Sequence, residues 1–277
     1  MTLTQGFNSL GTTIGPYLGS TLILAAATTT IEGASRAAEA QSVQGPYIGL
    51  GAVLLAIAVA IAVLKLPAIE TKQELADAST ATQYVHHESV WGYRHLVLGA
   101  VAIFMYVGGE VSIGSLLVNF MSHPDIAGLT EETAGKYLSL YWGGAMVGRF
   151  IGAAAMTRIK PGNALAFNAI VAIALLIIAM AVAGKAAMWA VLAIGLFNSI
   201  MFPTIFTLAI EGLGKHTGAG SGVLCMAIVG GAIVPVVQGF LADHVGLLHS
   251  FATPIVCYAY IAYYGLKGHN ADLKPAR

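Results

Sequence analysis

The chain has 277 residues, of which 57% are hydrophobic and 9% are charged, with a mean hydropathy of +0.78. Soluble domains carry roughly 25% charged residues because their surfaces face water, so this composition excludes a soluble globular protein. Thirteen Lys and Arg residues balance thirteen Asp and Glu residues, which excludes the basic surface of a nucleic-acid-binding protein. Cys225 and Cys257 lie in apolar runs without the spacing of a zinc site, so we expect two buried thiols.

Apolar segments follow one another along the chain, and each is about as long as the roughly 20 residues that cross a bilayer as a helix. Unbroken apolar runs such as 171–182 are typical of membrane helices and not of alternating strands. We therefore expect an all-α membrane protein with about eight transmembrane helices in a lipid bilayer. The predicted spans are 5–27, 46–66, 96–119, 137–157, 163–182, 187–210, 220–241 and 248–266.

The basic residues predict which loops lie in the cytoplasm, because cytoplasmic loops retain Lys and Arg. An even number of spans places both termini on one side. Only Arg36, Lys136 and Lys185 fall on the opposite side, so both termini are predicted to be cytoplasmic. The basic residues assigned to the loops on the side of the termini are Lys65, Lys72, Arg94, Arg149, Arg158, Lys160, Lys215, Lys267, Lys274 and Arg277.

A polar stretch at 67–94 separates two spans from six, and we interpret it as a cytoplasmic linker. The predicted domains are 1–66, the last two helices of an N-terminal bundle, then the linker 67–94, and 95–277, a C-terminal six-helix bundle. This asymmetry leads us to expect that the beginning of a two-bundle protein is missing. His86, His87 and Glu88 in the linker would bind a metal ion only with a further ligand, so a solvated segment is favoured.

Small residues and prolines mark special positions within the spans. Glycines four residues apart form stripes that let a neighbouring backbone approach closely, so we expect helix packing there, with helix sliding as the alternative. Prolines within spans predict kinks, because they lack a backbone N–H. The stripes are Gly11, Gly15, Gly19 and Gly144, Gly148, Gly152, and the prolines are Pro16, Pro203 and Pro235.

Polar residues share one face of the first predicted helix, since Gln5, Asn8 and Thr12 are three and four residues apart. Amides offer both donor and acceptor groups, which suits a ligand that carries hydroxyls. We therefore treat this face as a candidate binding surface. Hydrogen bonding between helices is the alternative, and exposure of Gln5 to water is another.

Glu110 lies near the middle of the third predicted span, after Gly108 and Gly109. Insertion of an acidic residue at a helix centre costs about 2.5–3.5 kcal/mol, so such residues generally have a function. Glu110 is a candidate for proton exchange, for binding a cation or for bonding a sugar hydroxyl. A structural hydrogen bond is the alternative.

The sixth predicted span places an amide, an aromatic ring and a kink within about two turns, at Asn198, Phe202 and Pro203. This combination is typical of a lined pocket, and ordinary packing is the alternative. Gln238 is a weaker candidate. Tyrosines near the inner end of the last span are assigned to an aromatic belt without a site, and they are Tyr258, Tyr260, Tyr263 and Tyr264.

Enzyme motifs with a known mechanism are absent from the sequence. We find no H-E-x-x-H helix, no G-x-S-x-G turn and no P-loop. We therefore expect a protein that is not an enzyme and has no cofactor.

Four stretches of the sequence together resemble the fucose-galactose-hexose symporters of the major facilitator superfamily, most closely their bacterial glucose/galactose branch. They are LTQGFNSLGTTIGPYLG at 3–19, YVGGEVSIGS at 106–115, GRFIG at 148–152 and FNSIMFPTIFTLAIEGLG at 197–214. The likeness covers nearly the whole chain. It implies a twelve-helix parent in two bundles, in which the present spans correspond to helices five through twelve.

The resemblance implies a hexose transporter of the bacterial inner membrane that works by cation symport and alternating access. Gln5, Asn8 and Asn198 would bond sugar hydroxyls, Phe202 would offer its ring to the sugar, and Glu110 would bind sugar or couple a proton or sodium ion. Fucose-transporting relatives have a tyrosine at the position of Phe202 and an uncharged residue at that of Glu110. Their acidic coupling residues lie on the first and fourth helices, which have no counterpart here.

The expected partners are a monosaccharide, a coupling cation and the lipid bilayer, together with the missing helices where another chain supplies them. The alternative is a membrane remnant that does not transport, or one subunit of a split transporter.

Overall fold

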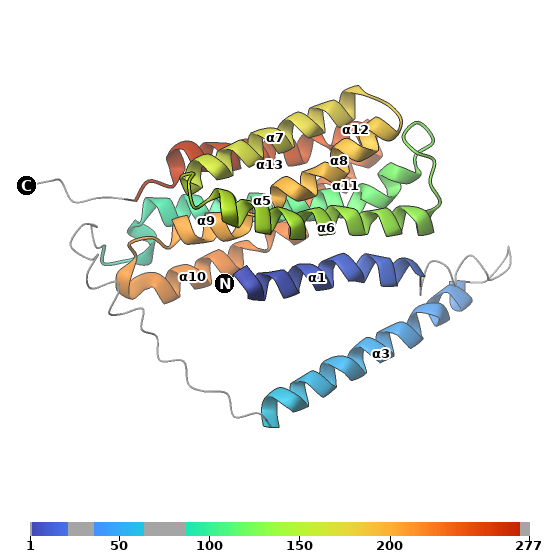
Figure 1. Cartoon of the computed structure of the whole chain (residues 1–277), viewed down its shortest axis with the longest axis horizontal. Helices are drawn as coiled ribbons and strands as arrows, with labels where there is room; N and C mark the ends of the chain where they lie inside the picture. Colours follow the sequence, from blue (N-terminus) through green and yellow to red (C-terminus); the bar gives the residue numbers. More distant parts are fainter. Residues whose placement is uncertain (1, 22–35, 64–86, 272–277) are drawn as a thin grey trace, which may run out of the picture.

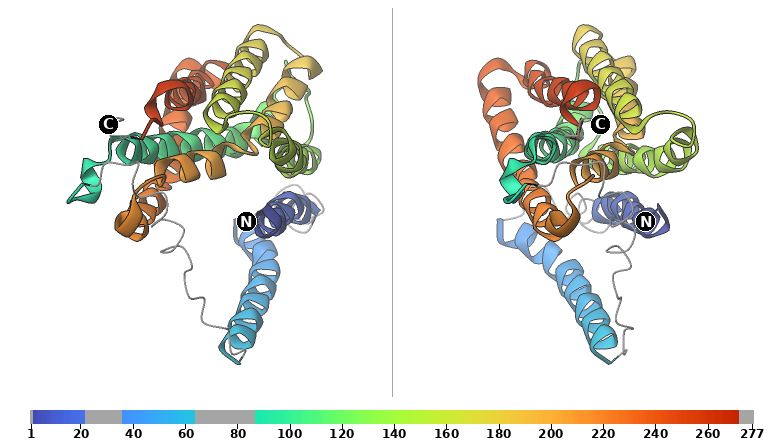
Figure 2. Two further views of the ribbon diagram at one scale, coloured as in Figure 1. Left: turned by 60° about the vertical axis from the view of Figure 1, so that its left-hand side comes forward. Right: turned by 90° about the vertical axis from the view of Figure 1, so that its left-hand side faces the viewer.

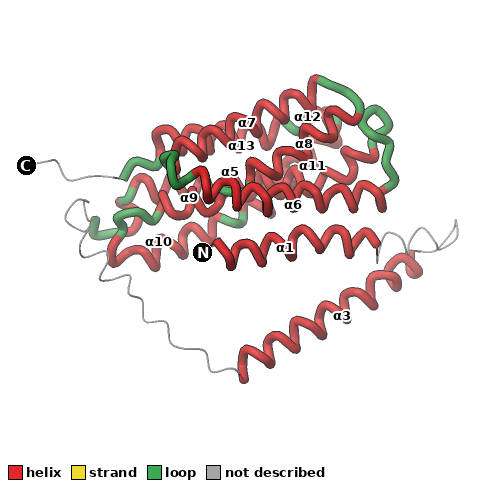
Figure 3. Tube along the Cα trace, viewed as in Figure 1, coloured by secondary structure: helices red, strands yellow, loops and turns green. Residues whose placement is uncertain are grey.

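The computed structural model describes residues 2–21, 36–63 and 87–271, and it describes side chains at 9–21, 44–63 and 87–271. Within these ranges the regular elements are helices and none is a strand (Figure 3). The helices are α1 (Thr2–Gly19), α3 (Arg36–Val63), η2 (Val90–Gly92), α5 (Arg94–Ser122), α6 (Glu131–Ala155), α7 (Pro161–Ala181), α8 (Lys185–Asn198), α9 (Met201–Ala209), η3 (Gly214–His216), α10 (Thr217–Ala227), α11 (Gly230–Val245), α12 (Leu247–Ser250), α13 (Ala252–Tyr263) and η4 (Tyr264–Gly268).

The eight predicted spans fall on these helices, the last three on α8–α9, on α10–α11 and on α12, α13 and η4. Five helical stretches are by themselves long and apolar enough to cross a membrane, counted over the described residues. The spans on α1, α6 and α13 do not meet that criterion. Helix α6 carries Glu131, Glu132 and Lys136 in its first two turns. The five stretches are 44–63, 94–122, 161–181, 185–209 and 214–245.

Helix α5 is the central element of the part from residue 87 onward. It packs against α6, α9, α11 and α13, and apolar side chains along it are fully buried, among them Leu96, Ile103 and Leu117. Near its C-terminal end the ring of Phe120 meets that of Phe251 with the centroids 5.2 Å apart. Burial on several sides explains why α5 is apolar around its circumference and tolerates few charges.

Local sequence determines where α6 and α7 begin. The side chain of Thr130 accepts a hydrogen bond from the Thr133 N–H, and two glutamates follow it in the first turn of α6, a pattern that stabilises a helix N-terminus. Pro161 is the first residue of α7, where its missing N–H costs nothing. These signals determine the first residues of two helices that contribute to the candidate site.

The second glycine stripe is a packing surface, as predicted. A Cβ atom added at Gly148 would collide with the Leu196 carbonyl and the Ser199 side chain, and one added at Gly195 would collide with the Tyr141 carbonyl. The backbones of α6 and α8 therefore approach closely. The first stripe does not behave in this way, since a Cβ atom at Gly11, Gly15 or Gly19 meets nothing within 4 Å.

Helices α1 and α3 differ in how they meet the rest of the molecule. Helix α1 runs alongside α6, whereas α3 extends away from the other helices (Figures 1 and 2). The described side chains of α3 are exposed on every side, including Tyr47 and Leu55. An apolar helix without a polar face is suited to contact lipid or other helices.

Hydrogen bonds gather the loop ends into two groups at opposite ends of the helices (Figure 1). At one end His95 Nε2 lies 2.8 Å from the Glu211 carbonyl, and the Tyr264 hydroxyl donates to the His95 carbonyl. At the other end the Gly184 N–H donates to the Asp125 carbonyl over 2.8 Å. The spans thus alternate in direction as predicted, and the side of the membrane on which each end lies stays a prediction.

Two other predictions meet different outcomes. Cys257 is buried as expected, but Cys225 is exposed on α10, because few residues of α10 are covered by other helices. Most of the predicted linker at 67–94 cannot be compared with the structure, because residues 64–86 lie outside the described residues.

Candidate functional site

A break between α8 and α9 organises the polar residues of the sixth span. Pro203 has no N–H to donate to the carbonyl four residues earlier, that of Ser199. Helix α8 ends at Asn198, and α9 begins at Met201. Arg149 Nε of α6 donates to the Ser199 carbonyl over 3.3 Å. The arginine thus satisfies an acceptor that the proline leaves without its helical donor.

Asn198 is fully buried at the end of α8, and its side-chain amide is hydrogen-bonded to two tyrosine hydroxyls. Its Nδ2 donates to the Tyr141 hydroxyl oxygen over 2.8 Å. Its Oδ1 accepts from the Tyr258 hydroxyl, also over 2.8 Å. The amide that the sequence predicts to bond sugar is therefore held by protein groups from α6 and α13 in this state.

Glu110 lies one turn along α5 from Tyr106. Its Oε1 accepts a hydrogen bond from the Tyr106 hydroxyl over 2.6 Å. The same hydroxyl lies 3.1 Å from the Asn198 carbonyl, and the Tyr141 hydroxyl lies 3.3 Å from the Glu110 carbonyl. We call Tyr106, Glu110, Tyr141, Asn198 and Tyr258 the Glu110 network. It joins four helices through one carboxylate and one amide.

Phe202 connects this network to a cavity of about 460 Å³. Its ring packs against Tyr106 with the centroids 6.2 Å apart and stacks on Phe206. The cavity is within the roughly 300–1,000 Å³ of small-molecule pockets. Its lining is mainly apolar, with Arg149, Thr204 and Thr207 as polar members. An apolar ring beside hydrogen-bonding groups is an arrangement that can hold the face and the edge of a sugar ring.

Arg149 also joins α1 to this part of the molecule, because its Nη1 donates to the Ser9 hydroxyl. Ser9 is buried and follows Asn8 in the chain. One guanidinium thus contacts α1 and the break between α8 and α9.

A family model described as Major Facilitator Superfamily matches residues 1–235. The chain is 58% identical over 272 residues to a glucose/galactose transporter of Brucella abortus, covering 98% of this chain and 63% of that protein. It is 44% identical to a putative glucose/galactose transporter of Helicobacter pylori, covering 98% of this chain and 66% of that protein.

The chain belongs to the major facilitator superfamily. A crystal structure of the Escherichia coli fucose:proton symporter matches with a TM-score of 0.70 and 30% identity, covering 96% of this chain and 67% of that one. This major facilitator chain is therefore an all-α, multi-pass protein of the bacterial membrane and not an enzyme. It spans about 63% of the length of the Brucella relative.

The structure brings some of the predicted site residues together and leaves others apart. Glu110, the Asn198 carbonyl and Phe202 each contact Tyr106 near the break in the sixth span of the major facilitator chain. Gln5 and Asn8 lie on α1, but their side chains are outside the described ones, so their role stays a prediction. Gln238 is buried and bonds Ser250 of α12 at 3.5 Å, apart from the network.

Four residues of the site were not predicted from the sequence of this major facilitator chain. Tyr258 was assigned to an aromatic belt, which is wrong because its side chain is fully buried in the network. Arg149 was counted as a loop cation, but it lies within α6. Tyr106 stands four residues before Glu110, a spacing that would have signalled contact. Tyr141 gave no such local signal.

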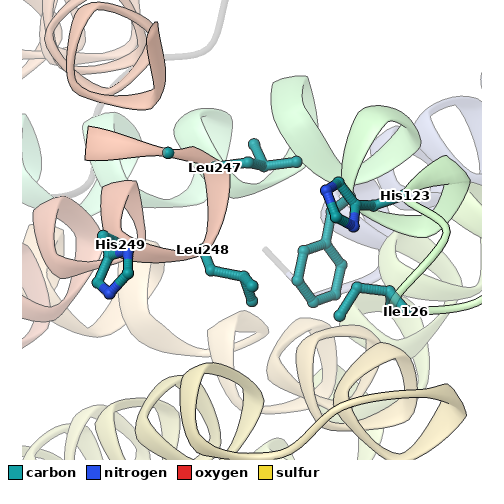
Figure 4. A pocket seen from close by; sticks show the side chains of 7 residues that line it. His123, Ile126, Leu247, Leu248 and His249 are labelled. Carbon is teal, nitrogen blue, oxygen red and sulfur yellow. The ribbon is translucent and has the colours of Figure 1, made fainter. Parts of the chain in front are cut away.

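A second pocket, of about 160 Å³, lies between the C-terminal end of α5 with the loop that follows it and the start of α12 (Figure 4). His123 and His249 line it together with Leu247 and Leu248. His123 Nδ1 lies 3.7 Å from the Asp125 carboxylate, and His249 Nδ1 lies 3.1 Å from the Val245 carbonyl. No group of three or more His, Cys, Asp and Glu residues suited to a metal ion occurs in the described part of the chain.

Proposed function

We propose that this chain forms the hexose-binding and cation-coupling part of a sugar transporter that works by alternating access. The observation that carries the proposal is the Glu110 network at the broken helix, which connects a carboxylate through Tyr106 to Phe202 in the cavity wall. Transporters bind substrates and coupling ions near the bilayer midplane, where helices are interrupted. The relatives, two glucose/galactose transporters and a fucose:proton symporter, support a hexose as the substrate class.

Each residue has a proposed role in this transporter. The ring of Phe202 packs against the apolar face of the hexose in the cavity. Gln5 and Asn8 of α1 form hydrogen bonds with its hydroxyls. Asn198 does so when the hydroxyl of Tyr141 or Tyr258 moves away from its amide. Glu110 takes up the coupling cation, which we propose to be a proton, as in the name of the fucose relative. Both termini are proposed to lie in the cytoplasm.

Transport itself is proposed to follow from relative movement of two halves. Helices α1 and α3 belong to one half, and the helices from α5 onward form the other. Rocking of the halves about the site exposes it alternately to each side of the membrane. Binding of sugar and cation together favours the exchange, because only then are the hydroxyls and the carboxylate all satisfied.

Uptake by a chimera tests this proposal. The aligned segment of the Brucella abortus transporter is replaced by this chain and expressed in a strain without its own glucose and galactose uptake, beside the 277-residue chain alone. We expect saturable glucose or galactose uptake by the chimera that a protonophore abolishes. A membrane-inserted chimera with no saturable uptake of either sugar would contradict the proposed substrate class. Uptake that depends on sodium and resists the protonophore would contradict proton coupling.

A further inference from the structure

We propose that Tyr106 is a positioning residue that transmits the protonation state of Glu110 to the break between α8 and α9. Its hydroxyl hydrogen is shared between two acceptors, the Glu110 carboxylate and the Asn198 carbonyl. Protonation of Glu110 would move that hydrogen to the carbonyl. The inference rests on the proposed role of Glu110 as the site of the coupling proton.

The geometry at Tyr106 carries the argument. The hydroxyl oxygen lies 2.6 Å from Glu110 Oε1 and 3.1 Å from the Asn198 carbonyl oxygen. A phenol has one hydrogen to donate, so it donates fully to only one of these acceptors. The shorter distance is typical of a bond to a charged acceptor. Asn198 is the last residue of α8, where carbonyls lack a partner within the helix.

Protonation reverses the direction of the bond between Glu110 and Tyr106. An ionised carboxylate only accepts, whereas a carboxylic acid also has an O–H to donate. Once Glu110 gains a proton, its O–H donates to the Tyr106 oxygen, and the Tyr106 hydrogen turns to the Asn198 carbonyl. One proton enters from solvent and forms one O–H bond on Glu110. Tyr106 keeps its own hydrogen throughout.

The switch acts on a segment that is anchored on either side. The Asn198 side chain is held by Tyr141 and Tyr258, and the next carbonyl, that of Ser199, is held by Arg149. An additional bond to the Asn198 carbonyl therefore tightens the segment between α8 and α9. Phe202, in the first turn of α9, packs on the Tyr106 ring, so the change reaches the cavity wall.

Glu110 is the group of this cluster that the proposal requires to change charge. Tyr106 faces it from its own helix, Tyr141 and Arg149 from α6, and Tyr258 from α13. Tyrosines are ordinarily uncharged at neutral pH, and an arginine remains charged in both states. A pH-dependent change at the break that is lost with Glu110 can therefore be assigned to this carboxyl.

The test compares Tyr106→Phe with Tyr260→Phe in the full chain in lipid nanodiscs. Phenylalanine keeps the ring that packs on Phe202 and removes the hydroxyl. Tyr260 is a matched control, because its hydroxyl also donates to a backbone carbonyl of another helix, that of Leu98 in α5, over 3.2 Å. Infrared difference spectra, with Glu110→Gln as the reference that lacks the carboxyl, measure protonation of Glu110. Hydrogen–deuterium exchange measures protection of the backbone amides between Ser199 and Thr204.

In the wild type and in Tyr260→Phe we expect exchange at these amides, corrected for its intrinsic pH dependence, to slow roughly 2- to 10-fold on acidification, the effect of one hydrogen bond. The midpoint should coincide with the infrared titration. In Tyr106→Phe the carboxyl should still titrate while exchange no longer follows it. If amide exchange in Tyr106→Phe still changes at the pH where the Glu110 carboxyl titrates, the proposed role of Tyr106 is overturned. The proposed proton site at Glu110 would then stand. A Glu110 carboxyl that does not titrate in the wild type overturns the proposed proton site and the relay with it.

A folding defect would be recognised separately, by the elution volume and melting temperature of Tyr106→Phe in detergent. Should that variant fail to fold, the wild type labelled with ¹³C at asparagine carbonyls gives the second measurement. Bonding to the Asn198 carbonyl must then shift its infrared band on acidification, with Asn198→Gln used to assign the band. A band that does not move overturns the relay.

Discussion

At the scale of single residues, the site is a set of polar groups that satisfy one another inside an apolar bundle. An unbonded amide or carboxylate is costly away from water, and the Asn198 side chain avoids this cost by using both ends of its amide. Glu110 is different, because its bonds depend on its charge. The network thus has a fixed part around Asn198 and a part around Glu110 that can change.

The first prediction concerns Glu110→Gln in the chimera. Glutamine keeps the shape and most of the hydrogen bonding but cannot take up a proton. If Glu110 couples the ion, the variant should exchange labelled for unlabelled sugar in counterflow yet fail to accumulate it against a gradient. If Glu110 only bonds sugar, both activities should fall together, with a loss of roughly 1.5–3 kcal/mol in binding.

Glu132→Gln is the matched control for this prediction, because it removes a carboxylate that pairs with Lys136 at 2.6 Å and lies partly in solvent. Counterflow and accumulation are measured at equal expression, and the control should keep both. Unchanged behaviour of Glu110→Gln in both assays would leave Glu110 with a structural role only.

The second prediction concerns Tyr258→Phe, which removes the donor to Asn198 Oδ1. The buried oxygen then loses a bond, which costs about 1–2 kcal/mol, so the melting temperature in detergent should fall. Tyr260→Phe, whose side chain is partly exposed, should lower it less. Equal melting temperatures for the two variants would mean that Asn198 does not depend on Tyr258.

These residues also show the limits of prediction from sequence. Glu110 was recognised because a carboxylate in an apolar span is conspicuous by itself. The partners of Asn198 could not be found, since Tyr141 and Tyr258 are 57 and 60 residues away in the chain. Four tyrosines crowd the last span, and composition alone could not separate the buried Tyr258 from the exposed Tyr263.

At the scale of elements, hydropathy located the spans because about 20 apolar residues suffice to define one. It could not locate the breaks at 199–200 and 228–229, since the apolar character continues through both. Pro203 predicted a kink, but the position of the break also depends on donors from α5 and α6. Contacts between helices, which a single-sequence pattern does not contain, decide where the interruption falls.

The third prediction contrasts two Gly→Ala substitutions within helices. Alanine in a helix interior normally adds about 1 kcal/mol of stability over glycine. Gly239→Ala in α11 should show this gain, because the added Cβ meets nothing within 4 Å. Gly195→Ala in α8 should instead destabilise by about 1–3 kcal/mol, because its Cβ collides with the Tyr141 carbonyl. Melting temperatures in detergent that shift in the same direction would contradict the close approach of α6 and α8.

At the scale of the whole molecule, the fourth prediction is the orientation in the membrane. Most basic residues fall on one side of the predicted topology, which places 67–94 in the cytoplasm. In a background with Cys225→Ala and Cys257→Ala, Ser79→Cys should react with an impermeant thiol reagent only in inverted vesicles. Asp125→Cys, in the exposed loop at the opposite end, should react in intact cells. Labelling of Ser79→Cys from outside would reverse the proposed topology.

The fifth prediction concerns the contact between α1 and the helices from α5 onward. Arg149 bonds Ser9 on α1 and the Ser199 carbonyl at the break. If the two halves rock, this contact cannot persist in every state. Removing it should therefore change the populations of the states by the contact's free energy. Hydrogen bonds to a charged group contribute roughly 1.5–3 kcal/mol, which is enough to change a population ratio about tenfold or more.

Spin labels at Leu10→Cys and Phe150→Cys, both at exposed positions, measure the separation of α1 and α6 in the chimera. Arg149→Gln should add a population with a longer distance. Arg149→Lys should fall between that variant and the wild type, because one ammonium keeps the charge but cannot reproduce the geometry of the guanidinium fork. A distance distribution in Arg149→Gln identical to that of the wild type would show that the contact does not hold the halves together. A longer distance in Arg149→Lys than in Arg149→Gln would show that the retained charge does not hold the halves together.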